Sequence, residues 1–403
     1  MKYVVVLGDG MADYPMPQLN NKTPLQCAKK PNIDFLAKHG ETGMVKTIPD
    51  GIPPGSDAAN LSVMGYNPKL YYTGRSPLEA ISMQIELSES DVAFRCNLVT
   101  LSDEPSYSDK VMIDYSSDEI STEESAQLIE AVNHHLKTKD IVFYPGISYR
   151  HCMIWTNGPE GLNLTPPHDI LERKITRYLP EGEYGRLLLD MMVESSAFLK
   201  DHAVNRDRIK RGLRPANSIW LWGEGKKPAI PEFHEKYGIK GSVISAVDLI
   251  KGIGLCAGLE SVDVEGATGN IHTNFAGKAH AALKELESGR DFVYVHIEAP
   301  DECGHRYEIE NKVKAIELID EQVVKPLMDG MEKYDDYRIL VLPDHPTPLS
   351  LRTHTPEPVP FILYQKSLKK PSAIIEGYDE FEAKKSGIFI EEGHTLMDKL
   401  IKG

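Results

Sequence analysis

The segment Lys2–Gly8, KYVVVLG, is a run of β-branched and apolar residues that leads into a Gly-Asp-Gly turn. Such a run predicts a buried strand, with Asp9 at its carboxyl end. Three later segments have the same character: residues 291–298 read DFVYVHIE, residues 337–342 read YRILVL, and residues 359–364 read VPFILY. These strands indicate an α/β fold built on an open, mainly parallel sheet.

Most of the candidate metal ligands in the chain follow one of these strands. Asp301 and His305 lie in the APDECGH segment after residues 291–298, and Asp344-His345 come directly after residues 337–342. Loops at the carboxyl ends of parallel strands meet at one edge of the sheet, which predicts a single centre there. The full set is Asp9, Asp301, His305, Asp344, His345 and His354.

Each of these residues also has an ordinary interpretation by itself. An Asp after a strand is common in turns, and a single His is more often structural than a ligand. Together, three carboxylates and three imidazoles would repel one another or stay unsatisfied without cations. Mixed oxygen and nitrogen ligands suit Mn²⁺, Zn²⁺ or Mg²⁺. His296 lies inside a strand pattern and is expected in the core or in contact with a ligand.

A second informative segment, residues 49–66, reads PDGIPPGSDAANLSVMGY. Its Gly and Pro residues exclude regular structure before Ser56, after which residues 58–64 have helical character. Ser56 is therefore expected at a helix N-terminus, where it could be an ordinary N-cap beside Asp57. The same position could hold a phosphate, and a neighbouring metal could activate the Ser56 hydroxyl as a nucleophile. The Asp and His set favours the second interpretation.

The middle of the chain has a different pattern, which predicts an inserted α+β domain. A capping box at Ser121 and Glu124 opens a helix that runs to about residue 135, and strand-like residues follow from 141. A further helical pattern covers residues 184–199. We expect a core of residues 1–77 and 213–403 and a cap or substrate domain of residues 78–212.

Composition excludes several classes of protein. The chain has 403 residues, 41% of them hydrophobic, which is normal for a globular protein with two cores. A formal net charge of −15 argues against nucleic-acid binding, and no apolar run reaches membrane-spanning length. The five dispersed cysteines indicate free thiols, and we expect a cytoplasmic protein. The oligomeric state stays open.

Motifs along the whole chain resemble one known family. The segments GDGMAD, PPGSDAANLSVMGY, YYTGRSPLEA, DVAFRCNL, APDECGH, PDHPTP and THTPEPVPF are similar to archaeal-type cofactor-independent phosphoglycerate mutases of the alkaline phosphatase superfamily. The same motifs mark a bacterial sister group proposed to act as homoserine kinase. The resemblance implies an alkaline-phosphatase-like three-layer core with an inserted cap.

The resemblance also implies how two divalent metal ions are held. One ion would be bound by Asp9, Ser56, Asp344 and His345, and the other by Asp301, His305 and His354. Mn²⁺ is the family's usual metal, with Zn²⁺ and Mg²⁺ as alternatives. Ser56 would be the nucleophile that forms a phosphoserine.

Cationic residues of the predicted insertion are candidates for recognising a small phosphorylated substrate, because Arg binds carboxylate and phosphate in a bidentate manner. The preferred substrate-binding candidates are Arg75, Arg95 and Arg150, and Asn97 and the weaker candidate Lys278 complete the set. The basic run at residues 206–214 is the weaker set, because charged runs are usually solvated. His151 and Asp57 are the candidates for acid–base catalysis.

The predicted reaction interconverts 2-phosphoglycerate and 3-phosphoglycerate without 2,3-bisphosphoglycerate. A related phosphotransferase with another acceptor, such as homoserine, would keep the metals and Ser56. It would not use a Walker loop, since the chain has no GxxxxGK[ST] segment. A phosphomonoesterase needs only a site open to water, and a non-enzymatic metal-binding module would leave Ser56 unexplained.

Overall fold

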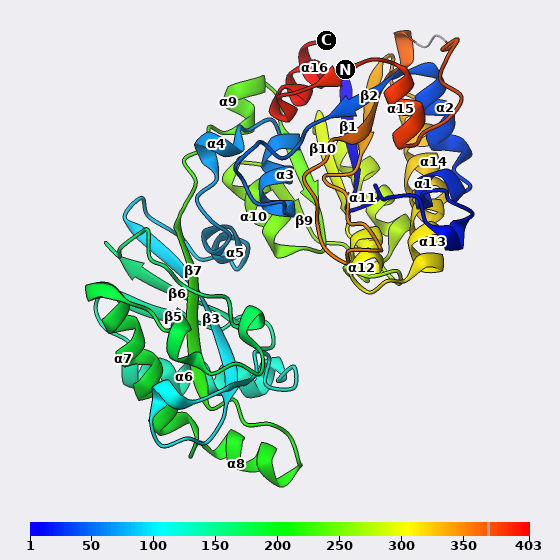
Figure 1. Cartoon of the computed structure of the whole chain (residues 1–403). Helices are drawn as coiled ribbons and strands as arrows, with labels where there is room; N and C mark the ends of the chain where they lie inside the picture. The colour runs from blue at the N-terminus through cyan, green and yellow to red at the C-terminus, as the bar shows by residue number, and fades with distance from the viewer. Residues whose placement is uncertain (369–370) are drawn as a thin grey trace. The chain divides into compact units, whose positions relative to one another are not determined.

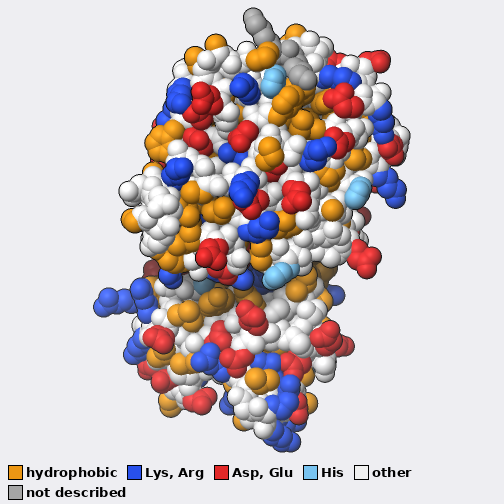
Figure 2. Space-filling view, turned by 90° about the vertical axis from the view of Figure 1, so that its right-hand side faces the viewer, with side chains coloured by type: hydrophobic (Ala, Val, Ile, Leu, Met, Phe, Trp, Pro, Cys, Tyr) orange, Lys and Arg blue, Asp and Glu red, His pale blue; other side chains and the backbone are white. Residues whose placement is uncertain are grey.

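The computed structural model describes residues 1–368 and 371–403. The chain forms two compact units, a larger one of Met1–Tyr72 and Ala229–Gly403 and a smaller one of Thr73–Pro228. Among the described residues, no helix combines the length and apolar character needed to cross a membrane. On the face drawn in Figure 2, acidic and basic side chains are interspersed, with hydrophobic side chains between them.

The larger unit is built on an eight-stranded sheet. Strands β11, β1, β10, β8 and β9 run parallel, β12 is antiparallel to both β11 and β2, and β13 is parallel to β2. In spatial order the strands are β13 (Phe389–Ile390), β2 (Glu41–Val45), β12 (Val359–Gln365), β11 (Tyr337–Leu342), β1 (Lys2–Gly8), β10 (Phe292–Ile297), β8 (Gly241–Ile244) and β9 (Glu260–Val262). The predicted, mainly parallel sheet is confirmed.

Helices cover both faces of this sheet, as Figure 1 shows. Val4 and Val6 of β1 pack against one helical layer, and successive side chains of a strand alternate between faces, so Val5 and Leu7 point to the other. The first layer contains α1 (Pro24–Cys27), α2 (Pro31–His39), α11 (Phe275–Glu287), α13 (Ile309–Ile319) and α14 (Lys325–Met331). The opposite layer contains α3 (Ser56–Val63) and α10 (Asp248–Cys256). The predicted three-layer core is therefore confirmed.

Shorter helices complete the larger unit. They are α4 (Pro68–Tyr71), α9 (Phe233–Tyr237), α12 (Ala299–His305), α15 (Glu380–Lys385) and α16 (Leu396–Lys402). Of these, α12 directly follows β10 and carries two of the predicted metal ligands, Asp301 and His305.

The smaller unit contains an antiparallel sheet in the order β4-β3-β6-β5, with β7 on the other side of β3. The strands are β3 (Asp91–Leu101), β4 (Met112–Asp114), β5 (Ile141–Tyr144), β6 (Arg150–Thr156) and β7 (Ser218–Lys226). The helices are α5 (Ser76–Ser82), α6 (Thr122–Leu136), α7 (Gly182–Leu199) and α8 (Ala203–Lys210). Ser121 caps α6 by accepting a hydrogen bond from the Glu124 N–H, as predicted.

One boundary of the predicted insertion is wrong. The sequence placed the return to the core at residue 213, whereas β7 pairs with β3 from Val99↔Ser218 to Val92↔Lys226 and so belongs to the smaller unit. Residues 218–222 read SIWLW, a local pattern typical of a buried strand. It contained no information about the partner strand, because pairing depends on residues more than 100 positions away.

Candidate active site

Three buried aspartates of the larger unit lie at the carboxyl ends of adjacent strands. Asp9 follows β1, Asp301 lies in α12 after β10, and Asp344 follows β11. The register pairs Gly8 with Ile297 and Leu7 with Leu342, so the three strands end at the same level. The parallel pairing therefore brings together carboxylates from both ends of the chain, as the sequence predicted.

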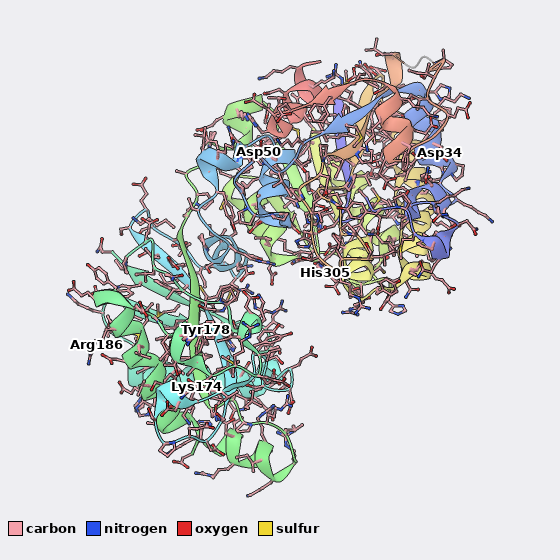
Figure 3. All side chains as sticks on the ribbon, in the orientation of Figure 1. Asp34, Asp50, Lys174, Tyr178, Arg186 and His305 are labelled. Atoms are coloured by element: carbon pink, nitrogen blue, oxygen red, sulfur yellow. The ribbon has the colours of Figure 1, made fainter. Side chains whose placement is uncertain are left out.

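Asp301 lies between two histidines. Its Oδ2 is 3.2 Å from Nε2 of His305, and its Oδ1 is 3.4 Å from Nε2 of His354. The two Nε2 atoms are 2.9 Å apart. The potential ligand atoms of these three residues all lie within 4.8 Å of one another, which is close enough to hold one metal ion. His305 is at the end of α12, where Figure 3 labels it.

Asp9, Asp344 and His345 form the adjoining group. Nε2 of His345 lies 3.7 Å from Oδ1 of Asp9 and 3.4 Å from Oδ2 of Asp344. Potential ligand atoms of Asp9, Asp301 and His345 also lie within 4.8 Å of one another, so the two groups are continuous. We call the six residues Asp9, Asp301, His305, Asp344, His345 and His354 the Asp-His cluster.

The electrostatics of the Asp-His cluster indicate an excess of buried negative charge. Burial and the neighbouring Asp344 and Asp301 carboxylates raise the pKa of Asp9 well above its usual value. Burial opposes ionisation of Asp301 too, but hydrogen bonds from His305 and His354 hold its pKa well below the usual range. Oδ1 of Asp9 is buried without a hydrogen-bond partner among the described residues. An orphaned carboxylate oxygen beside other carboxylates fits a bound cation.

Ser56 lies beside this cluster as the first residue of α3, with Gly55 as the N-cap. Its Oγ is 3.1 Å from Nε2 of His345. Nδ2 of Asn60 donates to both the Ser56 carbonyl (2.8 Å) and Oδ2 of Asp344 (2.9 Å), which ties α3 to the end of β11. The predicted position of Ser56 at a helix start is confirmed, while the alternative of a Ser56 N-cap is wrong.

Three supporting residues were less visible in the sequence. Oγ1 of Thr347 hydrogen-bonds Oδ1 of Asp301 and lies 3.3 Å from Nδ1 of His345. Nε2 of His296 lies 3.0 Å from Oδ2 of Asp9, which agrees with the expectation that His296 contacts a ligand. Gly10 has φ +63°, and a Cβ there would come within 2.8 Å of the Asp301 Cα, so only Gly fits. The PDHPTP motif contains Thr347, but nothing in it showed which residue Thr347 would contact.

The smaller unit gathers the predicted Arg residues on one face of its sheet. Arg95 pairs with Cys152 and Asn97 with Arg150, and directly opposed residues of an antiparallel pair share a face. Nε atoms of Arg75 and Arg95 each lie 3.0 Å from a different oxygen of Glu79. We call Arg75, Arg95, Asn97 and Arg150 the arginine face.

Trp222 orders the centre of the arginine face. The Arg95 guanidinium lies 4.4 Å from the centre of the Trp222 indole, and the indole Nε1 donates to Oδ1 of Asn97 at 3.0 Å. The stacked, charge-paired Arg95 is therefore held in one orientation, while the side chain of Arg150 is exposed.

Comparison with known proteins identifies the family of the chain. The family model described as 2,3-bisphosphoglycerate-independent phosphoglycerate mutase matches residues 37–205. A relative from Geobacter sulfurreducens, named as a probable 2,3-bisphosphoglycerate-independent phosphoglycerate mutase, is 53% identical over 100% of both chains. The chain belongs to the 2,3-bisphosphoglycerate-independent phosphoglycerate mutase family. A mutase of that name from Methanothrix thermoacetophila is 50% identical, again over 100% of both chains.

Solved structures agree with this family. The fold is similar to that of a Pyrococcus horikoshii protein, with a TM-score of 0.82, 28% identity and coverage of 100% of this chain and 96% of the other. A cofactor-independent phosphoglycerate mutase from Thermoplasma acidophilum matches with a TM-score of 0.68 and 27% identity, over 100% and 99% of the two chains. The resemblance inferred from the motifs is confirmed, and the chain is an enzyme of this mutase family.

Two of the candidates for the mutase site are placed differently from the expectation. His151 pairs with Cys96, so its ring lies on the opposite face of β6 from Arg150, among apolar side chains. Its Nδ1 accepts the Gly146 N–H at 3.0 Å, and burial lowers its pKa to about 3. His151 therefore does not share the arginine face, because the alternation of a strand is decided by a register that the sequence did not show.

Lys278 of α11 lies in the interior of the larger unit. It is fully buried and donates from Nζ to the His296 carbonyl at 2.9 Å, a position that fits support of β10 better than a contact with substrate. Burial lowers its pKa to about 8. Asp57 keeps a carboxylate next to Ser56, where it accepts hydrogen bonds from the Tyr72 hydroxyl (2.7 Å) and the Ala58 N–H (2.8 Å).

The weaker basic run has structural partners within the smaller unit. Arg208 and Arg211 both pair with Glu124, and Nη1 of Arg214 lies 3.1 Å from Oδ2 of Asp114. These contacts brace α8 against the start of α6, in line with the lower rank that the sequence assigned to them.

Proposed function

We propose that the chain interconverts 2-phosphoglycerate and 3-phosphoglycerate through a phosphoserine at Ser56, with two divalent metal ions and without 2,3-bisphosphoglycerate. One observation carries the proposal. The Ser56 hydroxyl lies at a helix N-terminus, 3.1 Å from His345, beside a buried cluster of Asp and His side chains. Family membership supplies the substrate class.

The residues of the Asp-His cluster fit two divalent ions. Asp301, His305 and His354 would hold one ion, and Asp9, Asp344, His345 and Ser56 the other, with Mn²⁺ as the expected metal and Zn²⁺ or Mg²⁺ as alternatives. Oδ1 of Asp9, which is buried and has no hydrogen-bond partner in the described part of the chain, is the donor that most clearly requires a cation. When bound, the ions supply Lewis-acid activation of the serine oxygen and neutralise charge on the transferred phosphoryl group.

The protein groups around Ser56 orient the phosphate. The first backbone N–H groups of α3 have no carbonyl partner within the helix and point toward an anion placed at its N-terminus. One of them, the Ala58 N–H, donates to Oδ1 of Asp57. Asn60 fixes the start of that helix relative to Asp344 through its two hydrogen bonds. The Ser56 oxygen is thereby presented to phosphorus in a single orientation, which favours in-line attack.

The arginine face fits the carboxylate of the glycerate. Arg95 is already oriented by Glu79 and Trp222, and Asn97 is oriented by the indole N–H. A charge-assisted contact from these residues would recognise the carboxylate of the acid. We propose the substrate-binding role for the smaller unit on this basis, with Arg75 and Arg150 as further contacts.

The test is a coupled enolase assay of 3-phosphoglycerate conversion by purified, metal-stripped protein to which Mn²⁺ is restored, with no 2,3-bisphosphoglycerate added. We expect activity that depends on Mn²⁺ and is absent in Ser56→Ala. Ser62→Ala is the matched control, because Ser62 lies on the same helix and its buried Oγ has no partner in the described part of the chain. Acid-quenched native enzyme should carry phosphoserine at position 56.

Inactive native protein that nevertheless binds two metal ions would overturn the mutase proposal and direct the search to another hydroxyl acceptor, homoserine first. Equal activity of Ser56→Ala and the native enzyme would overturn the phosphoserine step alone.

A further inference from the structure

A charged pair is fully buried in the larger unit, and the proposed chemistry does not use it. Nζ of Lys312, on α13, lies 2.7 Å from Oδ2 of Asp13, and neither side chain is exposed to solvent. Lys312 also donates to the Thr347 carbonyl at 2.7 Å, and Asp13 accepts the Leu349 N–H at 3.1 Å. One lysine therefore joins three segments of the chain, which are α13, the segment after β1 and the segment after β11.

Stability alone does not explain this pair. Burying two charges is costly, and an apolar pair of similar volume is often as stable. Backbone contacts already join the two segments, because the Thr347 N–H donates to the Ala12 carbonyl at 3.2 Å and Pro346 forms bridges with Met11 and Ala12. What Lys312 adds is a fixed position for the Thr347 carbonyl, from the side of α13.

Thr347 links the buried pair to the Asp-His cluster. Its hydroxyl has one proton, and Oγ1 hydrogen-bonds Oδ1 of Asp301 and lies 3.3 Å from Nδ1 of His345. An ionised carboxylate only accepts, so the hydroxyl donates to Asp301 and its oxygen accepts the Nδ1–H of His345. This arrangement gives His345 the tautomer whose Nε2, 3.1 Å from the Ser56 Oγ, carries no proton and can bind a metal ion.

We propose that Lys312 is a positioning residue for the metal-binding centre and that it acts through Thr347. By holding the Thr347 carbonyl, and by pairing with the Asp13 carboxylate that holds the Leu349 N–H, it keeps the Thr347 hydroxyl between Asp301 and His345. The inference rests on the metal site of the proposed function. It extends that site to α13, which carries none of the Asp-His cluster.

Loss of this support should weaken metal binding without removing a ligand. If the Thr347 hydroxyl moves away, the His345 ring loses the acceptor that holds the proton on Nδ1. A proton on Nε2 then competes with the metal ion for the same lone pair. Partners of this kind affect metal affinity by about 10- to 100-fold.

The experiment measures Mn²⁺ binding to the metal-stripped full chain by isothermal titration calorimetry, with urea unfolding of each metal-free protein as a check on folding. Lys312→Met alone would leave Asp13 as an unpaired buried charge, so the variant is Lys312→Met/Asp13→Asn, which keeps an acceptor for the Leu349 N–H. Thr347→Val removes the hydroxyl at nearly constant shape. We expect both variants to bind Mn²⁺ about 10- to 100-fold more weakly than native protein.

Two readouts separate positioning from a general loss of structure. Thr347→Ser keeps the hydroxyl and should bind Mn²⁺ like native protein. Adding the Lys312 and Asp13 changes to Thr347→Val should cause no further loss of affinity, because both act on the same hydroxyl. Lys30→Met is the matched control and should bind Mn²⁺ normally, since Lys30 is a buried lysine of the same unit that pairs with Asp34 of α2.

Native affinity in Lys312→Met/Asp13→Asn, or a loss that adds in full to that of Thr347→Val, would overturn the role of Lys312. If the double variant does not fold, Lys312→Gln/Asp13→Asn, which keeps a donor of shorter reach, is judged by the same two criteria. Native protein that binds no divalent metal would instead overturn the metal site of the proposed function, so the two failures are distinguishable.

Discussion

The Asp-His cluster of the larger unit and the arginine face of the smaller unit are the two regions for which we propose charged ligands, and they differ in how their own charge is balanced. In the cluster, Asp9, Asp301 and Asp344 are buried together and one carboxylate oxygen has no partner in the described structure. On the face, Arg75 and Arg95 share Glu79, so positive charge is already neutralised in part.

The difference in charge balance indicates which region needs a bound ligand to be stable. Buried like charges are costly unless a counter-ion is present, so the cluster is expected to be incomplete without metal. Arg75 is half-exposed and Arg95 is largely buried, but both already have a carboxylate partner, so they are stable by themselves and can exchange that partner for another carboxylate. The first site should bind tightly and affect stability, and the second should discriminate between substrates with little effect on stability.

The largest expected effect comes from a ligand of the cluster. Asp301→Asn removes the charge that both His305 and His354 contact. Loss of metal activation should raise the activation free energy by several kcal/mol and so lower kcat/KM by about 10³-fold or more. Metal analysis should show the loss of bound Mn²⁺. Glu302→Gln, a change at the next residue in an exposed pair with Arg306, should leave both quantities unchanged. Full metal binding by Asp301→Asn would contradict the assignment.

A second test measures how a buried carboxylate of the larger unit affects the free energy of unfolding. Glu380 is buried, accepts hydrogen bonds from the Asp13 N–H and the Thr23 hydroxyl, and has a pKa raised by burial to about 7. A raised folded-state pKa means that the native protein binds the proton more tightly than the unfolded chain. Stability is therefore highest below about pH 4.5 and falls by about 3 kcal/mol as pH rises to about 7.

Glu380→Gln should remove most of this pH dependence in urea unfolding between pH 5 and pH 8. Glu391→Gln, a change at an exposed carboxylate that pairs with Lys46, should leave the native pH dependence in place. If the native slope persists in Glu380→Gln, other groups are responsible for it.

The third prediction concerns metal and stability. Adding Mn²⁺ at 100 times its dissociation constant should stabilise the protein by about 2.7 kcal/mol. Hydrogen exchange should show the added protection in α12 and after β11, where the ligands lie, and none in β3 or β6 of the smaller unit. Equal protection in both units would remove the contrast drawn between them.

The smallest expected effect belongs to the arginine face. Arg95→Lys keeps the charge but loses the planar fork that Glu79 and Trp222 orient, so KM for phosphoglycerate should rise by about 10- to 100-fold with stability nearly unchanged. Arg173→Lys, an exposed Arg of the same unit whose Nη1 donates to the Tyr178 hydroxyl, is the control. A marked loss of thermal stability in Arg95→Lys, with KM for phosphoglycerate unchanged, would assign Arg95 a structural role.

Local chemistry explains why so much of the larger unit could be predicted. The strand Lys2–Gly8 has the predicted bounds, and the neighbouring strands also lie where their apolar runs placed them. In a parallel sheet the carboxyl ends necessarily meet at one edge, so residues that follow the strands could be grouped without knowing any distance. The Asp-His cluster and Ser56 followed from that rule together with the family motifs.

The errors share one physical cause, which is long-range pairing. Residues 218–226 were expected in the core domain but form β7, which pairs with β3 of the smaller unit. His151 was a candidate for acid–base catalysis but lies on the apolar face of β6.

Apolar periodicity and residue type are local properties, so the strands, the candidate site motifs and the class of chemistry could be predicted from the residues. Which side chains share a face, which partner orients each candidate ligand and where the second unit ends could be read only from the folded structure. These features depend on strand register, and a shift of one residue in register moves every side chain of a strand to the opposite face.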